Sequence, residues 1–407
     1  MIPSRGEPDL AAAVSVLRER FGHSGFRPGQ GPIAAAMLVG RDVLAVLPTG
    51  AGKSVCYQVP ALLASRPTLV VSPLIALMED QVTVLRRKGI PAAALTSIAP
   101  SSERRLAEGL LTGRGPALVY AAPERLVLPA FRESVAQAQI TRVVVDEAHC
   151  ISEWGHDFRP SYRAIGAFVQ AVGGPPVAAF TATATPATRA NIARQLGLRN
   201  PASFVAPVDR PNLRWEVVRA RCASGATRLL GEAVRRRGTG AALVYVPTRA
   251  LAAGLAAALR RQGQPAIAYH AGLSPARRAA AQHAFLSDPR GVVCATCAFG
   301  MGIDHPHVRL VAHLGMPGAL EAYVQEAGRA GRDGVPSRCL LVRLPTDLRL
   351  HRGRVRELPR GVRGFARRRL AGMRAYAAER RCRRRAIAAY FGENPPSCAG
   401  CDLCDRR

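Results

Sequence analysis

Short apolar runs rich in β-branched residues alternate with amphipathic stretches along most of this chain, and this alternation limits the possible fold strongly. Such a pattern is typical of a parallel sheet whose strands are joined by crossover helices. In the first half the predicted strands are Val43–Leu47, Thr68–Val71, Ala117–Tyr120, Thr141–Val145 and Val177–Phe180. A second series begins near Trp215 and includes Leu243–Val246, Ala266–Tyr269, Val292–Ala295 and Arg309–His313. The sequence therefore predicts an α/β protein with two sheets.

A chain of 407 residues has room for two or three domains. The proline-rich stretch PASFVAPVDRPN separates the two series of strands, and strand signals stop after Leu344. We therefore expect a first α/β domain over residues 1–207, a second over 208–344 and a small module over 345–407. The module is expected to contain a basic loop, a long arginine-rich helix and a cysteine cluster.

The strand Val43–Leu47 runs into the loop Pro48–Ser54, PTGAGKS, and a helical pattern follows. A loop between a strand and a helix can direct backbone N–H groups at phosphates, and the helix dipole favours negative charge there. Lys53 is expected to reach the phosphates and Ser54 to hold magnesium. The other expected nucleotide-binding positions are Thr49, Gly50, Ala51 and Gly52. Leu47 stands where the motif usually begins with glycine, and a chance Gly-Lys-Ser turn is the alternative interpretation.

The apolar run Val143–Val145 ends in two adjacent acids, Asp146 and Glu147. Ligands of open α/β sheets bind at the carboxyl ends of the strands, where this pair lies. Asp146 is suited to bind magnesium, and Glu147 is suited to orient or deprotonate the attacking water. The alternative role of such a pair is to cap a helix.

The formal net charge of +29 draws the chain towards polyanions and opposes compaction. Residues 345–407 alone hold 17 arginines against 6 acids, which predicts an arm that contacts phosphates with strong salt dependence. The alternative is a basic surface without a specific partner. We find no cleavable signal and no apolar stretch of about 20 residues, so we expect a cytoplasmic protein without membrane contact.

Four of the ten cysteines suit one tetrahedral zinc ion: Cys382, Cys398, Cys401 and Cys404. Four thiolates leave no open coordination position, so the ion is expected to be structural; free or disulfide-bonded thiols are the alternative. Cys294 and Cys297 also have the C-x-x-C spacing, but no second pair accompanies them, and we exclude a metal site there. The remaining cysteines are expected to be core or near-core residues: Cys56, Cys150, Cys222 and Cys339.

Several segments together resemble the RecQ-type DNA helicases of superfamily 2. Phe21–His23 and Phe26–Gln30 are similar to the adenine-recognition motif of that family. The resemblance implies that Arg27 and Gln30 read the edge of the base, and that His23 stands where the family usually has a stacking tyrosine. By the same resemblance, the two α/β domains are expected to be RecA-like P-loop domains.

The segment Ile151–Pro160 resembles the aromatic-rich loop of RecQ proteins. Trp154 and Phe158 are expected to stack on the bases of a single strand, and Arg159 to contact phosphate. Core packing is the alternative, although the charged residues in this segment make a poor core. Segments around Ser72 and Glu124 resemble strand-tracking motifs, which makes both residues candidates for contacts with nucleic acid.

In the second domain, Val292–Val308 and Gln325–Gly334 resemble the two motifs that face the nucleotide in the family. The resemblance implies that Arg332 is the arginine finger and Arg329 a second phosphate contact. It also implies a DNA backbone contact for Thr296. His305 and Gly318 depart from the family pattern, which usually has lysine at the first position and a polar residue at the second.

The resemblance implies an ATP-dependent DNA helicase or translocase that acts on junctions of single and double strands, travels 3′ to 5′ and serves recombination and repair. ATP, magnesium and zinc are the expected cofactors, and DNA with single-strand-binding or other repair proteins the expected partners. The sequence ends at Arg407 without the winged-helix and helical domains of many relatives, so we expect a short form. Two alternatives stay open. One is a zinc-stabilised DNA-binding or strand-annealing protein with a vestigial ATPase, and the other is an RNA remodeller.

Overall fold

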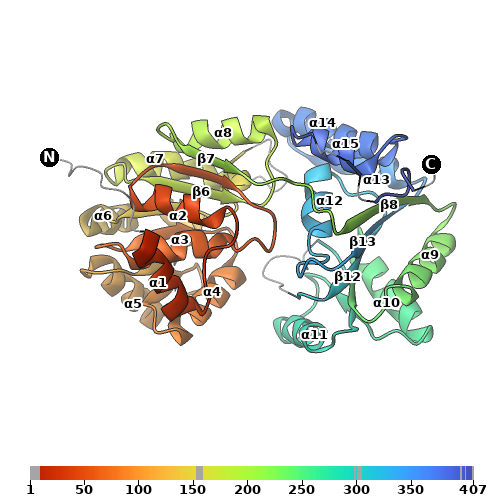
Figure 1. Ribbon diagram of the computed structural model, residues 1–407, viewed down its shortest axis with the longest axis horizontal. Coiled ribbons are helices and arrows are strands. Elements are labelled where there is room, and N and C mark those ends of the chain that lie inside the picture. The colour runs from red at the N-terminus through yellow and green to blue at the C-terminus, as the bar shows by residue number, and fades with distance from the viewer. Residues whose placement is uncertain are drawn as a thin grey trace. The chain divides into compact units, whose positions relative to one another are not determined.

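The computed structural model describes residues 10–152, 159–297, 299, 305–394, 397–398 and 400–405. The chain divides into two compact units, Met1–Ala206 and Pro207–Arg407, and the division falls inside the proline-rich stretch. Each unit is built on one parallel sheet with helices on both faces (Figure 1). No helix in the described ranges is long and apolar enough to span a bilayer.

The first unit is an alternation of helices and short strands. Its elements are α1 (Leu10–Phe21), α2 (Gln30–Leu38), β1 (Val43–Val46), α3 (Lys53–Leu62), β2 (Thr68–Val71), α4 (Ile75–Arg87), β3 (Ala92–Leu95), α5 (Ser101–Thr112), β4 (Leu118–Ala121), α6 (Pro129–Ala138), β5 (Arg142–Val145), α7 (Ala164–Ala171), β6 (Val177–Thr181), α8 (Pro186–Leu196) and β7 (Ala202–Val205). The strand order is β3-β4-β2-β5-β6-β1-β7, and every neighbouring pair is parallel.

Alternate residues of each strand enter two separate apolar layers, as the pleat of a strand requires. Val143 and Val145 pack with α5, α6, α7 and α8 on one face, whereas Val144 packs with α2, α3 and α4 on the other. Strands that are apolar on both faces are typical of a parallel sheet covered by helices on both sides. The carboxyl ends of β1, β5 and β6 are thereby held side by side at one edge.

The second unit repeats this design and adds a helical C-terminal segment. Its elements are β8 (Leu213–Arg219), α9 (Ala223–Arg235), β9 (Ala241–Tyr245), α10 (Arg249–Arg261), β10 (Ala266–Tyr269), α11 (Pro275–Ser287), β11 (Val292–Ala295), β12 (Val308–Leu314), α12 (Leu320–Ala327), β13 (Ser337–Arg343), α13 (Asp347–Glu357), α14 (Arg360–Ala377) and α15 (Arg383–Tyr390). The strand order is β10-β11-β9-β12-β13-β8, again parallel throughout.

The C-terminal segment shares a core with the second sheet. Trp215 of β8 packs against Tyr323 of α12 with ring centroids 5.6 Å apart, and Tyr323 packs against Tyr376 of α14 at 5.3 Å. Cys401 is fully buried in the same apolar cluster and forms an isolated bridge to Trp215. The helices α9 and α10 cover the opposite face of this sheet.

The expected α/β fold with two parallel sheets is confirmed, and each predicted strand lies within two residues of an observed one. Three strands were missed. Among them β3 reads Ala-Ala-Ala-Leu and lacks the β-branched residues that mark a strand.

Two other expectations were wrong. The basic loop expected after Leu344 is the helix α13, whose start is fixed by Asp347, because this carboxylate accepts hydrogen bonds from the N–H groups of Leu344 and Met316. Cys222 was expected near the core but is exposed, because it precedes α9 as its N-cap.

Candidate functional site

The loop between β1 and α3 has the geometry of a phosphate-binding loop. Gly50 and Gly52 have φ angles of 87° and 75°, a region that side chains disfavour. A Cβ atom on Gly52 would lie 2.5 Å from Nε2 of Gln30, so a side chain there would displace the amide of Gln30. The helix α3 begins at Lys53, which directs the first N–H groups of the helix towards the loop. Lys53 itself lies with Nζ 3.4 Å from the carbonyl oxygen of Leu47.

Gln30 and Arg27 brace this loop from the start of α2. The buried Gln30 donates from Nε2 to the carbonyl oxygens of Ala51 at 2.8 Å and Gly52 at 3.2 Å. Its Oε1 accepts from the backbone N–H of Arg27 at 2.8 Å. The guanidinium of Arg27 donates to the carbonyl of Gly50 at 3.0 Å. The sequence predicted a contact with adenine for both residues and missed this support of the loop.

The acidic pair follows β5 at the same edge of the sheet. Burial, and then the charge of Glu147, raise the pKa of Asp146 to about 6, while the charge of Lys53 lowers it. The hydroxyl of Tyr162 donates to the backbone carbonyl of Asp146 at 3.0 Å and fixes the end of the strand. A buried carboxylate beside a lysine is a suitable ligand for magnesium bound to a phosphate.

Glu147 adopts a left-handed conformation with φ 46°, which is unusual for a residue other than glycine. Its Oε2 lies 3.2 Å from Nδ1 of His149, and this nitrogen lies 2.9 Å from the hydroxyl of Thr181 at the end of β6. Thr181 in turn donates to the carbonyl of Thr183 at 3.3 Å. The acidic motif is therefore bonded to the Thr181–Thr183 segment, a link that the sequence did not reveal.

The residues predicted to contact DNA differ in their exposure. Ser72 is only 1% exposed, and its hydroxyl has no hydrogen-bond partner among the described residues. Glu124 is exposed, and Thr296 is half-buried just beyond β11. Ser72 is therefore the least accessible of the three, and the contacts with DNA stay predictions.

Of the aromatic-rich loop, the structure describes Arg159 but neither Trp154 nor Phe158, which lie outside the described residues. The guanidinium of Arg159 donates to the carbonyl of Pro73 at 2.7 Å. Arg159 thus connects the end of the aromatic-rich loop to the segment after β2.

The second unit presents the expected arginine segment directly after α12. Arg329 is buried and forms a hydrogen bond with Tyr245, whose hydroxyl also donates to the carbonyl of Phe299 at 2.9 Å. The ring of His313 stacks on Tyr245 with centroids 5.1 Å apart, and its Nε2 lies 2.7 Å from Oε2 of Glu326. Arg332 is half-buried in the glycine-rich turn that follows. This polar network holds the end of α12 and was not expected from the sequence.

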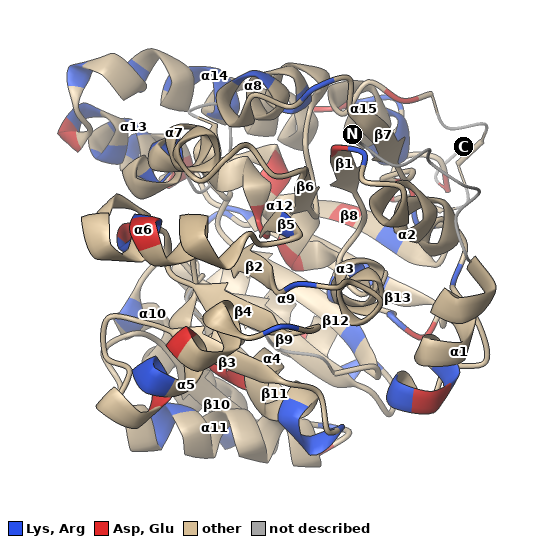
Figure 2. Cartoon of the chain, turned by 90° about the vertical axis from the view of Figure 1, so that its left-hand side faces the viewer, with Lys and Arg blue, Asp and Glu red and all other residues tan. Residues whose placement is uncertain are grey.

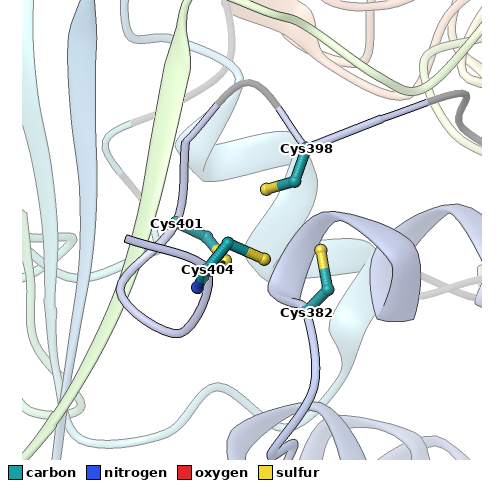
Figure 3. Close-up of side chains that lie close together, drawn as sticks. All are labelled: Cys382, Cys398, Cys401 and Cys404. Atoms are coloured by element: carbon teal, nitrogen blue, oxygen red, sulfur yellow. Dashed lines mark hydrogen bonds between the residues drawn. The ribbon is translucent and has the colours of Figure 1, made fainter. Parts of the chain in front are cut away.

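The four cysteines predicted to bind zinc meet in space. The Sγ atoms of Cys382, Cys398, Cys401 and Cys404 all lie within 4.8 Å of one another, and Figure 3 shows them pointing towards a common centre. Although burial opposes ionisation of Cys401, backbone N–H groups of Arg383, Cys404 and Leu403 lower the pKa of its thiol. Four thiolates with this spacing fit a closed tetrahedral zinc site.

A basic groove lies between α13 and α14. It has a volume of about 300 Å³, and its apolar lining residues include Leu348 and Leu370. Its four exposed arginines form no ion pair with any described residue: Arg352, Arg356, Arg367 and Arg374. Figure 2 shows basic residues in blue along both helices. Unpaired guanidiniums at this density suit the phosphates of a nucleic acid.

Three family models match successive parts of the chain. The DEAD/DEAH box helicase model matches residues 27–192, the helicase conserved C-terminal domain matches 225–334, and the RecQ zinc-binding model matches 346–405.

The curated relatives include proteins from Pasteurella multocida and Bacillus subtilis. The chain is 39% identical over 399 residues to the ATP-dependent DNA helicase RecQ of Pasteurella multocida, covering 98% of this chain and 63% of the relative. It is 41% identical over 337 residues to the probable ATP-dependent DNA helicase RecS of Bacillus subtilis, covering 82% of this chain and 67% of the relative. A second Bacillus subtilis protein, its ATP-dependent DNA helicase RecQ, is 39% identical over 97% of this chain and 67% of its own length. The chain thus spans about two thirds of the length of these relatives.

Solved structures with this fold include helicases with bound nucleic acid. One is the helicase Lhr of Mycobacterium smegmatis, bound to single-stranded DNA and AMP-PNP. The match covers 92% of this chain and 53% of the Lhr chain, with a TM-score of 0.62 and 21% identity. Another is Dbp5 of S. cerevisiae, bound to RNA and ADP BeF3. The match covers 90% of this chain and 100% of the Dbp5 chain, with a TM-score of 0.67 and 15% identity. At these identities the likeness concerns the fold alone, two RecA-like domains.

Proposed function

This chain belongs to the RecQ family of DNA helicases, and we propose on that basis that it hydrolyses ATP to move along DNA and separate strands at junctions of single and double strands. The observation that carries the proposal is the meeting of Lys53, Asp146 and Glu147 at the carboxyl edge of the first sheet. A phosphate loop, a metal-binding carboxylate and a base are the parts that phosphoryl transfer to water requires.

In the proposed nucleotide site, the backbone from Thr49 to Gly52 holds the phosphates and Lys53 neutralises their charge. Ser54 and Asp146 hold magnesium, which would offset the charge that develops on the transferred phosphoryl group. Glu147 orients the attacking water and accepts its proton, and His149 keeps the Glu147 carboxylate in place. His23, Arg27 and Gln30 are proposed to select adenine.

We assign Arg332 as the arginine finger and Arg329 as the second phosphate contact. Both belong to the second unit, whereas the phosphate loop belongs to the first, so hydrolysis would require both units. This dependence is what a motor needs, because each hydrolysis event is then tied to a conformational step. The His149–Thr181 bond connects the base to the Thr181–Thr183 segment, and we propose that this segment transmits that step.

The nucleic-acid partner is proposed to be DNA. The four arginines of the groove between α13 and α14 supply phosphate contacts without sequence preference. Trp154 and Phe158 are proposed to stack on bases of the single strand, with Arg159, Ser72 and Thr296 contacting its backbone. By family membership we propose 3′ to 5′ travel, a role in recombination and repair, and single-strand-binding or other repair proteins as partners.

The direct test is ATP hydrolysis by the full chain with single-stranded DNA or with RNA of the same sequence. We expect DNA to stimulate hydrolysis much more than RNA, and Lys53→Ala to lower the stimulated rate by about 100-fold or more. Arg236→Gln, which removes only an exposed pair with Glu232 on α9, is the matched control and should leave the rate unchanged. Equal stimulation by RNA would favour an RNA remodeller, and unchanged DNA activities in Lys53→Ala would favour a strand-annealing protein with a vestigial ATPase.

A further inference from the structure

Arg210, in the segment that precedes β8, holds both sides of the turn that contains the assigned arginine finger. Its NH1 group donates to the carbonyl of Gly328 at 2.6 Å, and its NH2 group donates to the carbonyl of Gly331 at 2.5 Å. These two carbonyls bracket Arg329 and lie just before Arg332 in the chain. Because the donors of a planar guanidinium are a fixed distance apart, Arg210 sets the distance between the carbonyl groups of Gly328 and Gly331.

The turn itself leaves little freedom at Gly331. Its φ is 53°, and its N–H donates to the carbonyl of Val308 at 2.9 Å. A Cβ atom there would lie 2.5 Å from Nδ2 of Asn212, which donates to the carbonyl of Gly331 at 2.8 Å. Arg210 and Asn212 thus hold the same carbonyl from one short segment, two residues apart.

The segment that carries Arg210 is fixed in turn by the zinc module. The carboxylate of Asp209 accepts two hydrogen bonds from Arg384 of α15, at 2.9 and 2.5 Å, and the side chain of Arg384 is only 1% exposed. One residue earlier, the N–H of Val208 donates to both carboxylate oxygens of Glu393, at 3.1 and 2.9 Å. Both contacts come from α15 and the residues just after it.

The position of α15 depends on the cysteine cluster. Cys382 is the N-cap of this helix, and the next residue, Arg383, donates to the carboxylate of Asp402 at 3.0 Å. Asp402 follows Cys401, and its own N–H donates to the carbonyl of Trp215 in β8. Two zinc-binding cysteines are therefore one residue away from the ion pair that fixes α15.

We propose that Asp209 and Arg210 are positioning residues that transmit the state of the zinc module to the arginine-finger turn, Gly328–Arg332. The contacts run from the cysteine cluster through α15 to Asp209, and from Arg210 to the two carbonyls of the turn. The proposal rests on the proposed function for the role of Arg332 but not for the contacts themselves. Zinc would then support ATP hydrolysis as well as the folding of its own module.

Electrostatics favours a specific role for Arg210 over a general packing role. Burial lowers the pKa of Arg210, and the charge of Arg332 also lowers it, whereas Cys339 and Asp333 raise it; the two guanidiniums therefore lie within interacting range. Two like charges at close range are destabilising unless neighbouring acceptors offset them. The carbonyls of Gly328 and Gly331 are those acceptors for Arg210.

Hydrogen exchange tests the contacts without reference to activity. In the zinc-loaded full chain, Arg210→Gln and Asp209→Asn should speed exchange of the amides of residues 328–334 about tenfold. Exchange in α9 and α10 should stay unchanged, and Arg236→Gln should alter nothing in the turn. Should Arg210→Gln open the whole second sheet, Arg210→Lys, which keeps the charge but not the two-pronged geometry, replaces it.

Removal of zinc by a chelator should speed exchange in the same turn of the unmodified chain. In Arg384→Gln, whose link to Asp209 is already broken, chelation should speed exchange in the turn little more than it does in β8 and β13. The reversed pair Asp209→Arg with Arg384→Asp should restore part of the protection. Two results would overturn the proposal. One is unchanged exchange in the turn with Arg210→Gln, and the other is an effect of chelation on the turn, relative to β8 and β13, that is equal with and without Arg384.

Kinetics separates this inference from the proposed function. We expect Arg210→Gln to lower kcat for DNA-stimulated ATP hydrolysis on the order of tenfold, with KM for ATP changed much less, at full zinc content. Absence of hydrolysis by the unmodified chain would contradict the proposed function, while the exchange results would still decide the inference. Normal kcat in Arg210→Gln, with hydrolysis intact in the unmodified chain, would contradict the positioning role alone.

Discussion

Asp146 lies buried at the end of β5, where burial and the charge of Glu147 raise its pKa from 3.8 to about 6. The folded chain therefore binds this proton more tightly than the unfolded chain does. Between about pH 4 and pH 6 the group makes the folded state progressively less stable as the pH rises, and above that window the loss is constant. A carboxylate held at such a cost is typical of a site that binds a cation.

We predict that Asp146→Asn raises the free energy of unfolding of the metal-free chain at pH 7.5, on the order of 1–3 kcal/mol, while it abolishes ATP hydrolysis. The gain should shrink as the pH is lowered towards 4.5. Denaturant unfolding across this pH range, followed beside the unmodified chain, provides the measurement. A variant that is less stable than the unmodified chain at pH 7.5 would show that the carboxylate is structural.

The side-chain amide of Gln30 accepts a hydrogen bond from the backbone N–H of Arg27 and donates hydrogen bonds to carbonyl groups of the phosphate loop. We predict that Gln30→Ala raises KM for ATP about tenfold, because the loop loses two hydrogen bonds that hold its carbonyls. Steady-state hydrolysis of ATP and GTP separates the two roles of this residue. A similar loss for both nucleotides reflects the loop, and any excess loss for ATP reflects contact with adenine. An unchanged KM for ATP would be inconsistent with both roles.

At the scale of elements, Asp42 joins three strands at the edge of the first sheet opposite the nucleotide site. Its carboxylate accepts from the N–H groups of Val177, at the start of β6, and Arg199, ahead of β7, at 2.8 and 2.6 Å. Its side chain is only 4% exposed, so water cannot replace these bonds. The carboxylate therefore aligns β6 and β7 on either side of β1.

We predict that Asp42→Ala lowers the free energy of unfolding of the first unit by about 2–3 kcal/mol, because the buried N–H of Val177 and the partly buried N–H of Arg199 lose their acceptor. Asp42→Asn, which keeps one acceptor oxygen, is the matched control and should cost less. KM for ATP should change little in either variant at a temperature where both are folded. Thermal unfolding and steady-state kinetics together measure this, and equal stability of Asp42→Ala and the unmodified chain would refute it.

Elements with a local signature were predictable from the sequence, and contacts between distant residues were not. The β-branched run of β5 and its terminal acids identify the strand and the site at its end, since both signals lie within a few residues. The alanines of β3 carry no such signal. The bond from Arg210 to Gly328 joins residues 118 positions apart, and the sequence showed only a proline-rich join at Arg210. Spacing alone did reveal the cysteine cluster, because three of its members are close in the chain.

At the scale of the whole molecule, the second unit and the cysteine cluster form one cooperative body. Cys401 is fully buried in the same apolar cluster as Trp215 and Tyr376, so the zinc module has no core of its own that is separate from the sheet. Loss of zinc should therefore destabilise the second sheet as well as α14 and α15.

We predict that Cys398→Ser loses zinc and lowers the stability of the second unit by about 3 kcal/mol or more, because the metal supplies folding free energy. Cys297→Ser is the matched control, since Cys297 is exposed, lies outside the cluster and should leave one zinc per chain. Zinc content and hydrogen exchange in β8 and β13 provide the readout. Full protection of these strands in zinc-free Cys398→Ser would mean that the module folds independently.

The central claim is that hydrolysis at Lys53, Asp146 and Glu147 drives strand separation. The most direct measurement follows ATP hydrolysis and strand separation together on DNA duplexes with a 3′ or a 5′ single-stranded tail, with Glu147→Gln as the control. We predict separation of the 3′-tailed duplex that requires ATP, and loss of both activities in Glu147→Gln while DNA binding persists. Separation that continues unchanged in Glu147→Gln, or DNA-stimulated hydrolysis without separation of either duplex, would contradict the account.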